Sequence, residues 1–250
     1  MMNVVFYTGA GMSRESGLPT FRGEGGLWDS LDVEALASRG AWYCGRRCDC
    51  NERRQRVLDF FNPIRRQILA SEPNDGHRII AALEEWYSVT VITQNGDDLH
   101  ERAGSTRVIH IHGEALKNAS TLHPCEAYDI DPANPDICIG DKAPDGSQVR
   151  PYVVLFGEEI ERTVWRAAVE ATTRPSLFVV VGSTLLVHPA ADLLTMLPES
   201  SELYIIDPVN VALPKGCHKE FTHIRCGATE GLRELLTILK RKRYENYSNL

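Results

Sequence analysis

Two short polar segments carry side chains suited to acid–base and ribose chemistry. Gln94–Asp97 directly follows the apolar run 89–93, and two histidines, His110 and His112, lie at the end of the next apolar run, residues 108–111. The carboxyl ends of neighbouring parallel strands meet at one edge of an α/β sheet, which is where such sheets bind ligands. Because side chains two residues apart on a strand share a face, we expect both histidines on one face and a catalytic role for one of them.

A glycine-rich turn follows the first apolar run, residues 4–7. The turn Thr8–Ser13 contains Gly9 and Gly11. Small residues let the backbone approach a phosphate, and a helix N-terminus that follows adds amide donors. Glycines also occur in such turns because the backbone needs a positive φ. This segment alone therefore leaves a nucleotide site and a simple turn as equal alternatives.

The loop after this turn contains Phe21, Arg22 and Trp28. Beside a phosphate cradle, such a loop could close over a cofactor, with the Arg meeting a phosphate and the Phe excluding water. The alternative is an ordinary surface loop whose Phe anchors it to the core.

The apolar pattern predicts strands that alternate with helices. Runs that are apolar at nearly every position suit strands buried on both faces, as in parallel sheets. The predicted strands are Val4–Tyr7, Val89–Thr93, Val108–Ile111, Leu177–Val181 and Leu203–Ile206, and the predicted helices are His77–Trp86, Val164–Thr172, Ala190–Met196 and Gly231–Lys240. This alternation is typical of an α/β protein with a doubly wound, Rossmann-like parallel sheet.

Two stretches interrupt the alternation. Residues 29–75 have a helical pattern rich in Arg and Cys, and residues 114–150 are rich in Pro and Gly, which indicates loops. We therefore expect a Rossmann-like domain of residues 1–28, 76–113 and 151–250. The two interrupting stretches are expected to form a smaller inserted module of helices and loops.

Composition narrows the class of protein. With 43% hydrophobic residues among 250, the chain can bury a sizeable core. Its formal net charge of −7 argues against non-specific nucleic-acid binding. No apolar run approaches the roughly 20 residues of a membrane helix, and the N-terminus lacks the pattern of a signal peptide. Seven unevenly placed cysteines argue against a disulfide framework. We expect a cytoplasmic protein without nucleic-acid or membrane partners.

Five motifs, in order along the chain, resemble those of the sirtuin (Sir2) family. They are Thr8–Arg22, Thr93–His100 with Arg102–Ser105, Ile111–Glu114, Phe156–Glu158 and Gly182–Ala190. The stretch Ile139–Pro151 looks like that of a zinc-free bacterial subgroup of these NAD-dependent protein deacylases. The resemblance implies a Rossmann-like fold and an enzyme that consumes NAD as it removes acyl groups from protein lysines.

The resemblance also implies roles for individual residues. Asn95, Asp97 and His112 would be catalytic, with Asn95 orienting the ribose and a water, Asp97 holding the nicotinamide carboxamide and His112 deprotonating a ribose hydroxyl. NAD would be bound by Gly9, Ala10, Gly11, Ser13, Phe21, Arg22, Trp28, Gln94, Asn95, Gly96, Asp97, Gly182, Ser183, Thr184, Asp207 and Ala228. An acyl-lysine peptide would be bound as an added strand by Phe61, Ile64, Phe156, Gly157, Glu158 and Val187. Such strand addition relies on main-chain hydrogen bonds.

The segment after the His-Gly pair departs from the pattern of most sirtuins. Most carry two Cys-x-x-Cys pairs there, whereas this segment has only Cys125 and Cys138. Structural zinc almost always takes four ligands, mostly Cys and His, so we expect no metal. Cys44, Cys48 and Cys50 match no recognisable metal site, and we expect solvated or partly buried thiols there.

The acyl pocket also departs from one branch of the family. Sirtuins that favour succinyl or malonyl groups carry a Tyr-x-x-Arg pair, and those positions are Phe61 and Ile64 here. Without an Arg partner, an acidic acyl group would be buried unpaired, which is costly. We therefore expect acetyl or longer apolar acyl groups to be preferred, with Arg65 as a side chain that could swing in and reverse this.

Two further departures concern NAD. Gly96 replaces a branched aliphatic residue, which predicts a lost wall of the nicotinamide pocket and weaker inhibition by nicotinamide. Asp207 replaces the usual Asn at the adenine ribose, and its carboxylate can still accept from ribose hydroxyls.

Two other functions compete with deacylation. An ADP-ribosyltransferase or NAD hydrolase would use the same activated NAD, and Gly96 is the feature that could loosen the site in that direction. A non-catalytic NAD sensor would be expected to have lost Asn95 or His112, and both are present.

Overall fold

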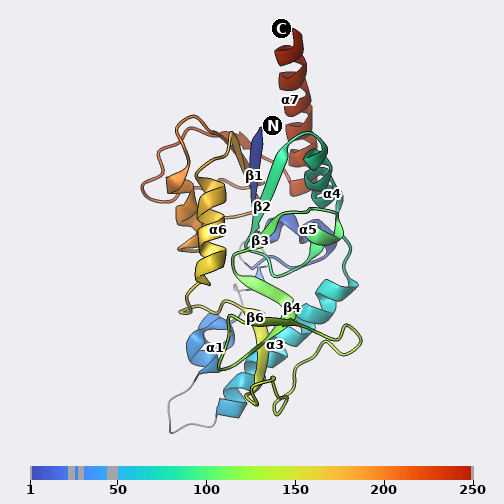
Figure 1. Ribbon diagram of the computed structural model, residues 1–250, viewed down its shortest axis with the longest axis vertical. Coiled ribbons are helices and arrows are strands. Elements are labelled where there is room, and N and C mark those ends of the chain that lie inside the picture. The colour runs from blue at the N-terminus through green and yellow to red at the C-terminus, as the bar shows by residue number, and fades with distance from the viewer. Residues whose placement is uncertain (1, 22–25, 28–30, 44–49, 249–250) are drawn as a thin grey trace.

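A parallel sheet of six strands forms the centre of the protein (Figure 1). The computed structural model describes residues 2–21, 26–27, 31–43 and 50–248. Across the sheet the strands are β3 (Val108–His110), β2 (Ser88–Thr93), β1 (Asn3–Thr8), β7 (Leu177–Val181), β8 (Glu202–Ile206) and β9 (Thr222–Ile224). All neighbours are parallel. The chain begins at β1, extends to one side, then crosses back to β7, so the predicted doubly wound sheet is confirmed.

Helices cover both faces of this sheet. On one face, Val4 and Phe6 of β1 pack in a buried cluster with residues of α4 (Asp75–Ala82) and α7 (Ala228–Ser248). Val5 and Tyr7 point to the other face and join a cluster with α6 (Arg162–Thr172) and the 3₁₀ helix η5 (Ala190–Met196). Side chains alternate between the two faces of a strand, which explains why these strands are apolar at every position. Figure 1 shows α6 on one side and α4 with α7 on the other.

Several predicted elements differ in detail from the structure. The predicted helix at His77–Trp86 is α4 followed by the 3₁₀ helix η4 (Leu83–Glu85), and η5 is a 3₁₀ rather than an α-helix. Helix α7 starts three residues earlier than predicted and continues to Ser248, so that its end projects beyond the sheet (Figure 1). Strand β9 was not predicted, because three residues are too few to show a period.

A smaller module lies beyond the carboxyl ends of β1 and β2. It consists of α1 (Val33–Ala37), α2 (Arg39–Trp42), α3 (Cys50–Ala70) and an antiparallel sheet in the order β5 (Ala127–Asp129), β4 (Gly113–Ser120), β6 (Val149–Val153). The expectation of loops over residues 114–150 is therefore wrong at these strands. Strand β4 (GEALKNAS) consists mostly of residue types with low β propensity, namely Gly, Glu, Ala, Lys and Asn, so it is stabilised by its partners rather than by its composition.

Three short helices complete the described part of the chain. The 3₁₀ helices η1 (Ala10–Met12) and η2 (Arg14–Ser16) follow β1, and α5 (Leu99–Arg102) follows β2. Among the described residues, no helix is both long and apolar enough to cross a membrane.

Candidate functional site

Two glycine loops meet where the sheet changes direction, between β1 and β7. The amide of Gly9 donates to the carbonyl of Val181 at 3.0 Å, and the amide of Gly11 donates to the carbonyl of Gly182 at 2.9 Å. A Cβ atom added to Gly11 would lie 2.6 Å from the Cα of Gly182. Glycine is thus required here by the contact between the two loops, a reason that the sequence alone did not reveal.

Asn95 and Asp97 are buried beside the first glycine loop. The Ser13 hydroxyl donates to Oδ2 of Asp97 at 2.8 Å, and Nδ2 of Asn95 donates to the carbonyl of Gly9 at 3.0 Å and to Ser13 Oγ at 3.1 Å. Burial raises the pKa of Asp97, while hydrogen bonds from Ser13 and from the amide of Leu99 act in the opposite direction. The structure therefore brings the predicted Ser13, Asn95 and Asp97 into one hydrogen-bonded group.

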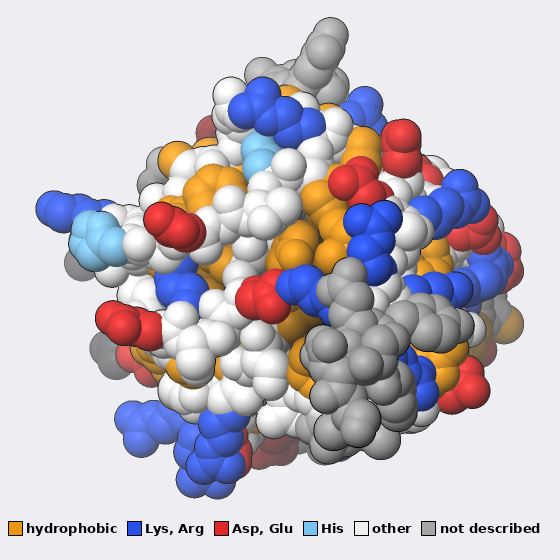
Figure 2. All heavy atoms as spheres, turned by 90° about the horizontal axis from the view of Figure 1, so that it is seen from above, with side chains coloured by type: hydrophobic (Ala, Val, Ile, Leu, Met, Phe, Trp, Pro, Cys, Tyr) orange, Lys and Arg blue, Asp and Glu red, His pale blue; other side chains and the backbone are white. Residues whose placement is uncertain are grey.

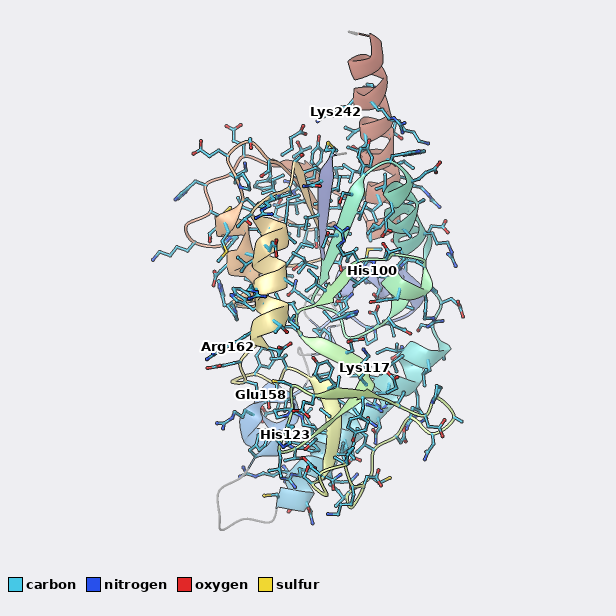
Figure 3. All side chains as sticks on the ribbon, viewed as in Figure 1. His100, Lys117, His123, Glu158, Arg162 and Lys242 are labelled. Atoms are coloured by element: carbon cyan, nitrogen blue, oxygen red, sulfur yellow. The ribbon has the colours of Figure 1, made fainter. Side chains whose placement is uncertain are left out.

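A second chain of hydrogen bonds lies beneath this group. Nε2 of His100 is 3.1 Å from Thr8 Oγ1, which donates to Thr93 Oγ1 at 2.9 Å, and Thr93 Oγ1 accepts from the amide of Asn95 at 3.1 Å. All three side chains are fully buried. His100 lies on α5, close to the carboxyl end of the sheet (Figure 3). This chain joins the ends of β1 and β2, and we had assigned no role to Thr8, Thr93 or His100.

The two histidines have different surroundings. His110 ends β3, where Nε2 is 2.8 Å from Glu101 Oε1 and Nδ1 is 3.1 Å from the carbonyl of Asn95. His112 lies in the turn before β4, so the expectation that both histidines share a strand face is wrong. The following Gly113 has a φ of +82°, and a Cβ there would lie 2.4 Å from the carbonyl oxygen of Tyr152. The turn therefore requires glycine directly after His112.

His112 is half-buried, and its surroundings favour the neutral imidazole, the form that can act as a base. Burial lowers the pKa of its imidazole, although a hydrogen bond with the backbone of Gln94 partly opposes this. Gln94 in turn donates from Nε2 to Ser183 Oγ at 2.7 Å. These contacts link His112, the end of β2 and the second glycine loop, Gly182–Thr184.

Gly96 does not leave an empty space at its Cβ position. Its carbonyl accepts from the amide of Ala115 at 2.8 Å, and an added Cβ would lie 3.2 Å from that nitrogen and 3.3 Å from the Cβ of Ala115. A side chain at this position would start toward β4, and the weaker inhibition by nicotinamide expected from Gly96 stays a prediction.

Of the residues predicted to contact the adenosine part of NAD, Asp207 follows the carboxyl end of β8 and Ala228 lies at the start of α7. Asp207 is buried, its Oδ1 accepts from the amide of Val209 at 3.0 Å, and burial raises the pKa of its carboxyl. Ala228 is the first residue of α7. Oε1 of Glu15, which follows the first glycine loop, accepts from the amide of Thr229 at 3.1 Å. Glu15 thus ties α7 to the loop, a contact that we did not predict.

The predicted peptide-binding residues fall into three groups. Phe156 and Gly157 are exposed at the junction of the two parts, and Val187 is half-buried beside the exposed Leu186. Phe61 is buried in the module and Ile64 is half-buried. The Glu158 carboxylate does not face solvent but pairs with the guanidinium of Arg150. Of the predicted cofactor loop, Phe21 is half-buried, whereas Arg22 and Trp28 lie outside the described residues.

The cysteines form no metal site in the part of the chain that the structure describes, where no group of three or more His, Cys, Asp or Glu side chains is arranged to hold an ion. Cys125, Cys138, Cys217 and Cys226 are free thiols. Cys50 is disulfide-bonded, so the expectation of a thiol is wrong at this position. Cys44 and Cys48 lie outside the described residues.

The fold and the site define an α/β protein with a doubly wound sheet, two glycine loops at its switch point and a buried Asn–Asp pair between them. The chain belongs to the Sir2 family, whose sequence model matches residues 9–189. An NAD-dependent protein deacylase of Bacteroides thetaiotaomicron is 41% identical over 244 residues, which cover 96% of this chain and 98% of the relative. One of Mycobacterium tuberculosis is 40% identical over 196 residues, with 77% and 79% covered.

Solved structures agree with this assignment. A complex of a Sir2 homologue with NAD has a TM-score of 0.80 at 30% identity and covers 96% of this chain and 90% of its own. A Sir2 variant with a deacetylated p53 peptide and 3′-O-acetyl ADP ribose has a TM-score of 0.74 at 28% identity, with 94% and 92% covered.

Proposed function

We propose that the protein is an NAD-dependent protein-lysine deacylase, which transfers the acyl group of a lysine to the ADP-ribose part of NAD and releases nicotinamide. The observation that carries the proposal is the group of Ser13, Asn95 and Asp97 beside His112, at the switch point of the sheet. Family membership and relatives that are NAD-dependent protein deacylases support it.

The residues at the switch point suit NAD as the co-substrate. Backbone from the two glycine loops, Gly9–Ser13 and Gly182–Thr184, would receive the phosphates, since glycine lets them approach main-chain amides. The amide nitrogen of Asn95 makes the contacts to Gly9 and Ser13, and within the described residues its Oδ1 accepts no hydrogen bond. That oxygen would orient a ribose hydroxyl or a water. The carboxylate of Asp97 would accept from the nicotinamide carboxamide.

His112 would act as the general base. The acyl oxygen of the acyl-lysine attacks the ribose carbon as its bond to nicotinamide breaks. The neutral imidazole of His112 then removes a proton from a neighbouring ribose hydroxyl, whose oxygen attacks the former acyl carbon and closes a ring. Water opens the resulting cyclic species to give the free lysine and O-acyl-ADP-ribose. A positioned base of this kind contributes about 10²–10⁴-fold to a rate.

The pH dependence follows from the burial of His112. Its neutral form is the base, and its pKa is lowered below the ordinary 6.5. The midpoint of the acid limb of deacylation, where the imidazole becomes protonated, is therefore expected below pH 6.5. A pH profile of kcat/KM with an acetyl-lysine peptide, which reports the pKa values of the free enzyme, checks this. An acid limb centred above pH 7 would contradict the assignment.

A peptide is expected to enter beside Gly157. The amide of Phe156 donates to the carbonyl of Ala37, and its carbonyl accepts from the amide of Arg39, both at 2.8 Å. Gly157 is exposed, and its backbone forms no hydrogen bond with any described residue. Its main chain and that of the loop around the exposed Leu186 would bind an extended peptide as an added strand.

The surroundings of Arg65 support a preference for acetyl or apolar acyl groups. Arg65 is fully buried and donates to four oxygens, which are the carbonyls of Ala115, Lys117 and Pro135 and the side-chain Oδ1 of Asn118. Burial lowers the pKa of its guanidinium to about 10. A guanidinium held by four acceptors is not free to swing toward an acyl carboxylate, contrary to the alternative raised from the sequence.

We therefore expect deacetylation to exceed desuccinylation by at least about tenfold in kcat/KM, because burying an unpaired carboxylate costs more than the ~1.4 kcal/mol of a tenfold change. Matched acetyl and succinyl peptides measure the ratio. Replacing Phe61 with Tyr and Ile64 with Arg together should raise desuccinylation. If the unaltered protein removed succinyl groups faster than acetyl groups, the predicted preference would be wrong.

Mass spectrometry of an acetyl-lysine peptide incubated with NAD tests the function itself. The expected products are deacetylated peptide, nicotinamide and O-acetyl-ADP-ribose. Modified protein or free ADP-ribose with unchanged peptide would instead mean ADP-ribosyl transfer or NAD hydrolysis, and absence of turnover would mean an NAD sensor.

We also propose that residues 1–28, 76–113 and 151–250 form the NAD-binding domain and that 29–75 with 114–150 form the module. A separate buried cluster that includes Trp42, Leu58 and Val149 supports this division. A cytoplasmic location without membrane or nucleic-acid partners stays a prediction. In keeping with it, Figure 2 shows acidic and basic side chains interspersed on one end of the molecule.

A further inference from the structure

A buried ion pair joins the module to the segment that carries Gly157. The guanidinium of Arg150, on β6, is 1% exposed and faces the carboxylate of Glu158. Nη1 donates to Oε1 at 2.6 Å, and Nη2 donates to Oε2 at 2.9 Å. This two-bond geometry is the strongest arrangement of Arg with a carboxylate, and it fixes orientation as well as distance. Figure 3 shows Glu158 where the segment crosses between the module and α6, which begins at Arg162.

The Arg150 side chain is itself held by the end of α2. Its guanidinium carbon lies 5.8 Å from the ring centroids of both Trp42 and Tyr43, and Nη1 also donates to the Tyr43 hydroxyl at 3.1 Å. Trp42 Nε1 and the Tyr43 hydroxyl in turn donate to Thr121. These contacts hold the Arg150 side chain in one position.

The segment around Gly157 is tied down on both sides. Before Gly157, the amide and carbonyl of Phe156 are bonded to Ala37 and Arg39. After it, Oε2 of Glu158 accepts from Arg150 and also from the amide of Leu155 at 2.9 Å, which closes a short turn. Gly157, with a φ of +86°, lies between these two attachments with its main chain exposed.

We propose that Arg150 and Glu158 are positioning residues for the acyl-lysine peptide, and that they act by holding the main chain of Gly157 in the geometry that an added strand requires. The proposal rests on the proposed deacylase function. It keeps the expected main-chain contact of this segment with the peptide and gives the Glu158 side chain a separate task, because both oxygens of its carboxylate accept hydrogen bonds within the protein.

A role in positioning explains this pair better than a role in stability. Desolvation of two charges offsets much of their attraction, so a buried ion pair is weak evidence for stability, whereas it does specify one geometry. Loss of the pair should therefore weaken binding of the peptide, which would contact this segment. Binding of NAD, at the switch point of the sheet, should be unchanged.

The test compares two variants with a matched control. Glu158→Gln keeps the shape but removes one charge, and the double variant Arg150→Met with Glu158→Gln leaves no unpaired buried charge and so guards against misfolding. The control is Asn62→Ala, a buried residue of the same module whose two side-chain hydrogen bonds go to the main chain of Ile137. Steady-state kinetics with an acetyl-lysine peptide give the two KM values and kcat, and thermal unfolding gives the Tm.

We expect both pair variants to raise the KM for the peptide by about tenfold, the effect of losing one or two main-chain hydrogen bonds. The KM for NAD should stay within about twofold of its original value, and Asn62→Ala should lower the Tm without raising the KM for the peptide. A folded double variant with an unchanged KM for the peptide would overturn the proposal. So would an equal rise of the KM in Asn62→Ala.

The outcome is separable from that of the proposed function. If the unaltered protein does not deacylate, fluorescence anisotropy of a labelled acetyl-lysine peptide in the presence of ADP-ribose replaces the kinetics. Weaker peptide binding by the double variant then supports positioning without any claim on catalysis, and unchanged binding rejects it.

Discussion

Replacing His112 with Ala is expected to lower kcat for deacylation by about 10²–10⁴-fold, the contribution of a positioned general base. The KM for NAD should change little, because the main-chain loops around Gly11 and Gly182 remain. Release of nicotinamide precedes the proton transfer in the proposed reaction. The variant should therefore still exchange labelled nicotinamide into NAD when an acetyl-lysine peptide is present, and this exchange is the measurement that distinguishes a lost base from a lost binding site.

His110 provides the matched control for this variant. Its two ring nitrogens are engaged by Glu101 and by the carbonyl of Asn95. Gln at this position keeps a donor for that carbonyl, so His110→Gln should retain most of the deacylase activity. If His110→Gln lost as much activity as His112→Ala, the assignment of the base would be wrong.

Gly11→Ala is expected to weaken both folding and NAD binding through one added methyl group. Its Cβ would lie 2.6 Å from the Cα of Gly182, which is main chain and cannot rotate away. The two loops would have to separate, at a cost of about 1–3 kcal/mol of folding free energy. Because the separated loops are those proposed to receive the phosphates, the KM for NAD should rise by at least about tenfold, as a displacement near 1 Å is sufficient for large losses. Thermal unfolding and NAD titration measure the two effects.

Gly40 offers the same substitution without the contact. It lies in α2, where the nearest atom to an added Cβ is Ser38 Oγ at 3.6 Å. Gly40→Ala should leave the KM for NAD unchanged and should stabilise the protein slightly, since Ala favours the helix. Equal losses in the two variants would mean that the close approach of the loops is not the reason for Gly11.

The sequence by itself determined the central architecture and the chemistry-bearing segments. Runs such as Val4–Tyr7 and Leu177–Val181 are apolar at every position, which suits strands covered on both faces, and helices between them lead to a doubly wound sheet. Because the carboxyl ends of parallel strands share an edge, Gln94–Asp97 and the glycine turn were expected near one another, and Ser13 does bond to Asp97.

Tertiary structure alone decided how these residues are held. Glycine at positions 11 and 182 reflects the approach of two loops that are far apart in the chain. Glu15 reaches the start of α7 from 214 residues away, and Arg65 is committed to four acceptors of the module. Likewise, the two oxygens of Glu158 accept hydrogen bonds from Arg150, a partner that the motif alone did not identify. A pattern of residue types reports burial and local geometry, whereas the partner of a buried polar group depends on which distant segment the fold places against it.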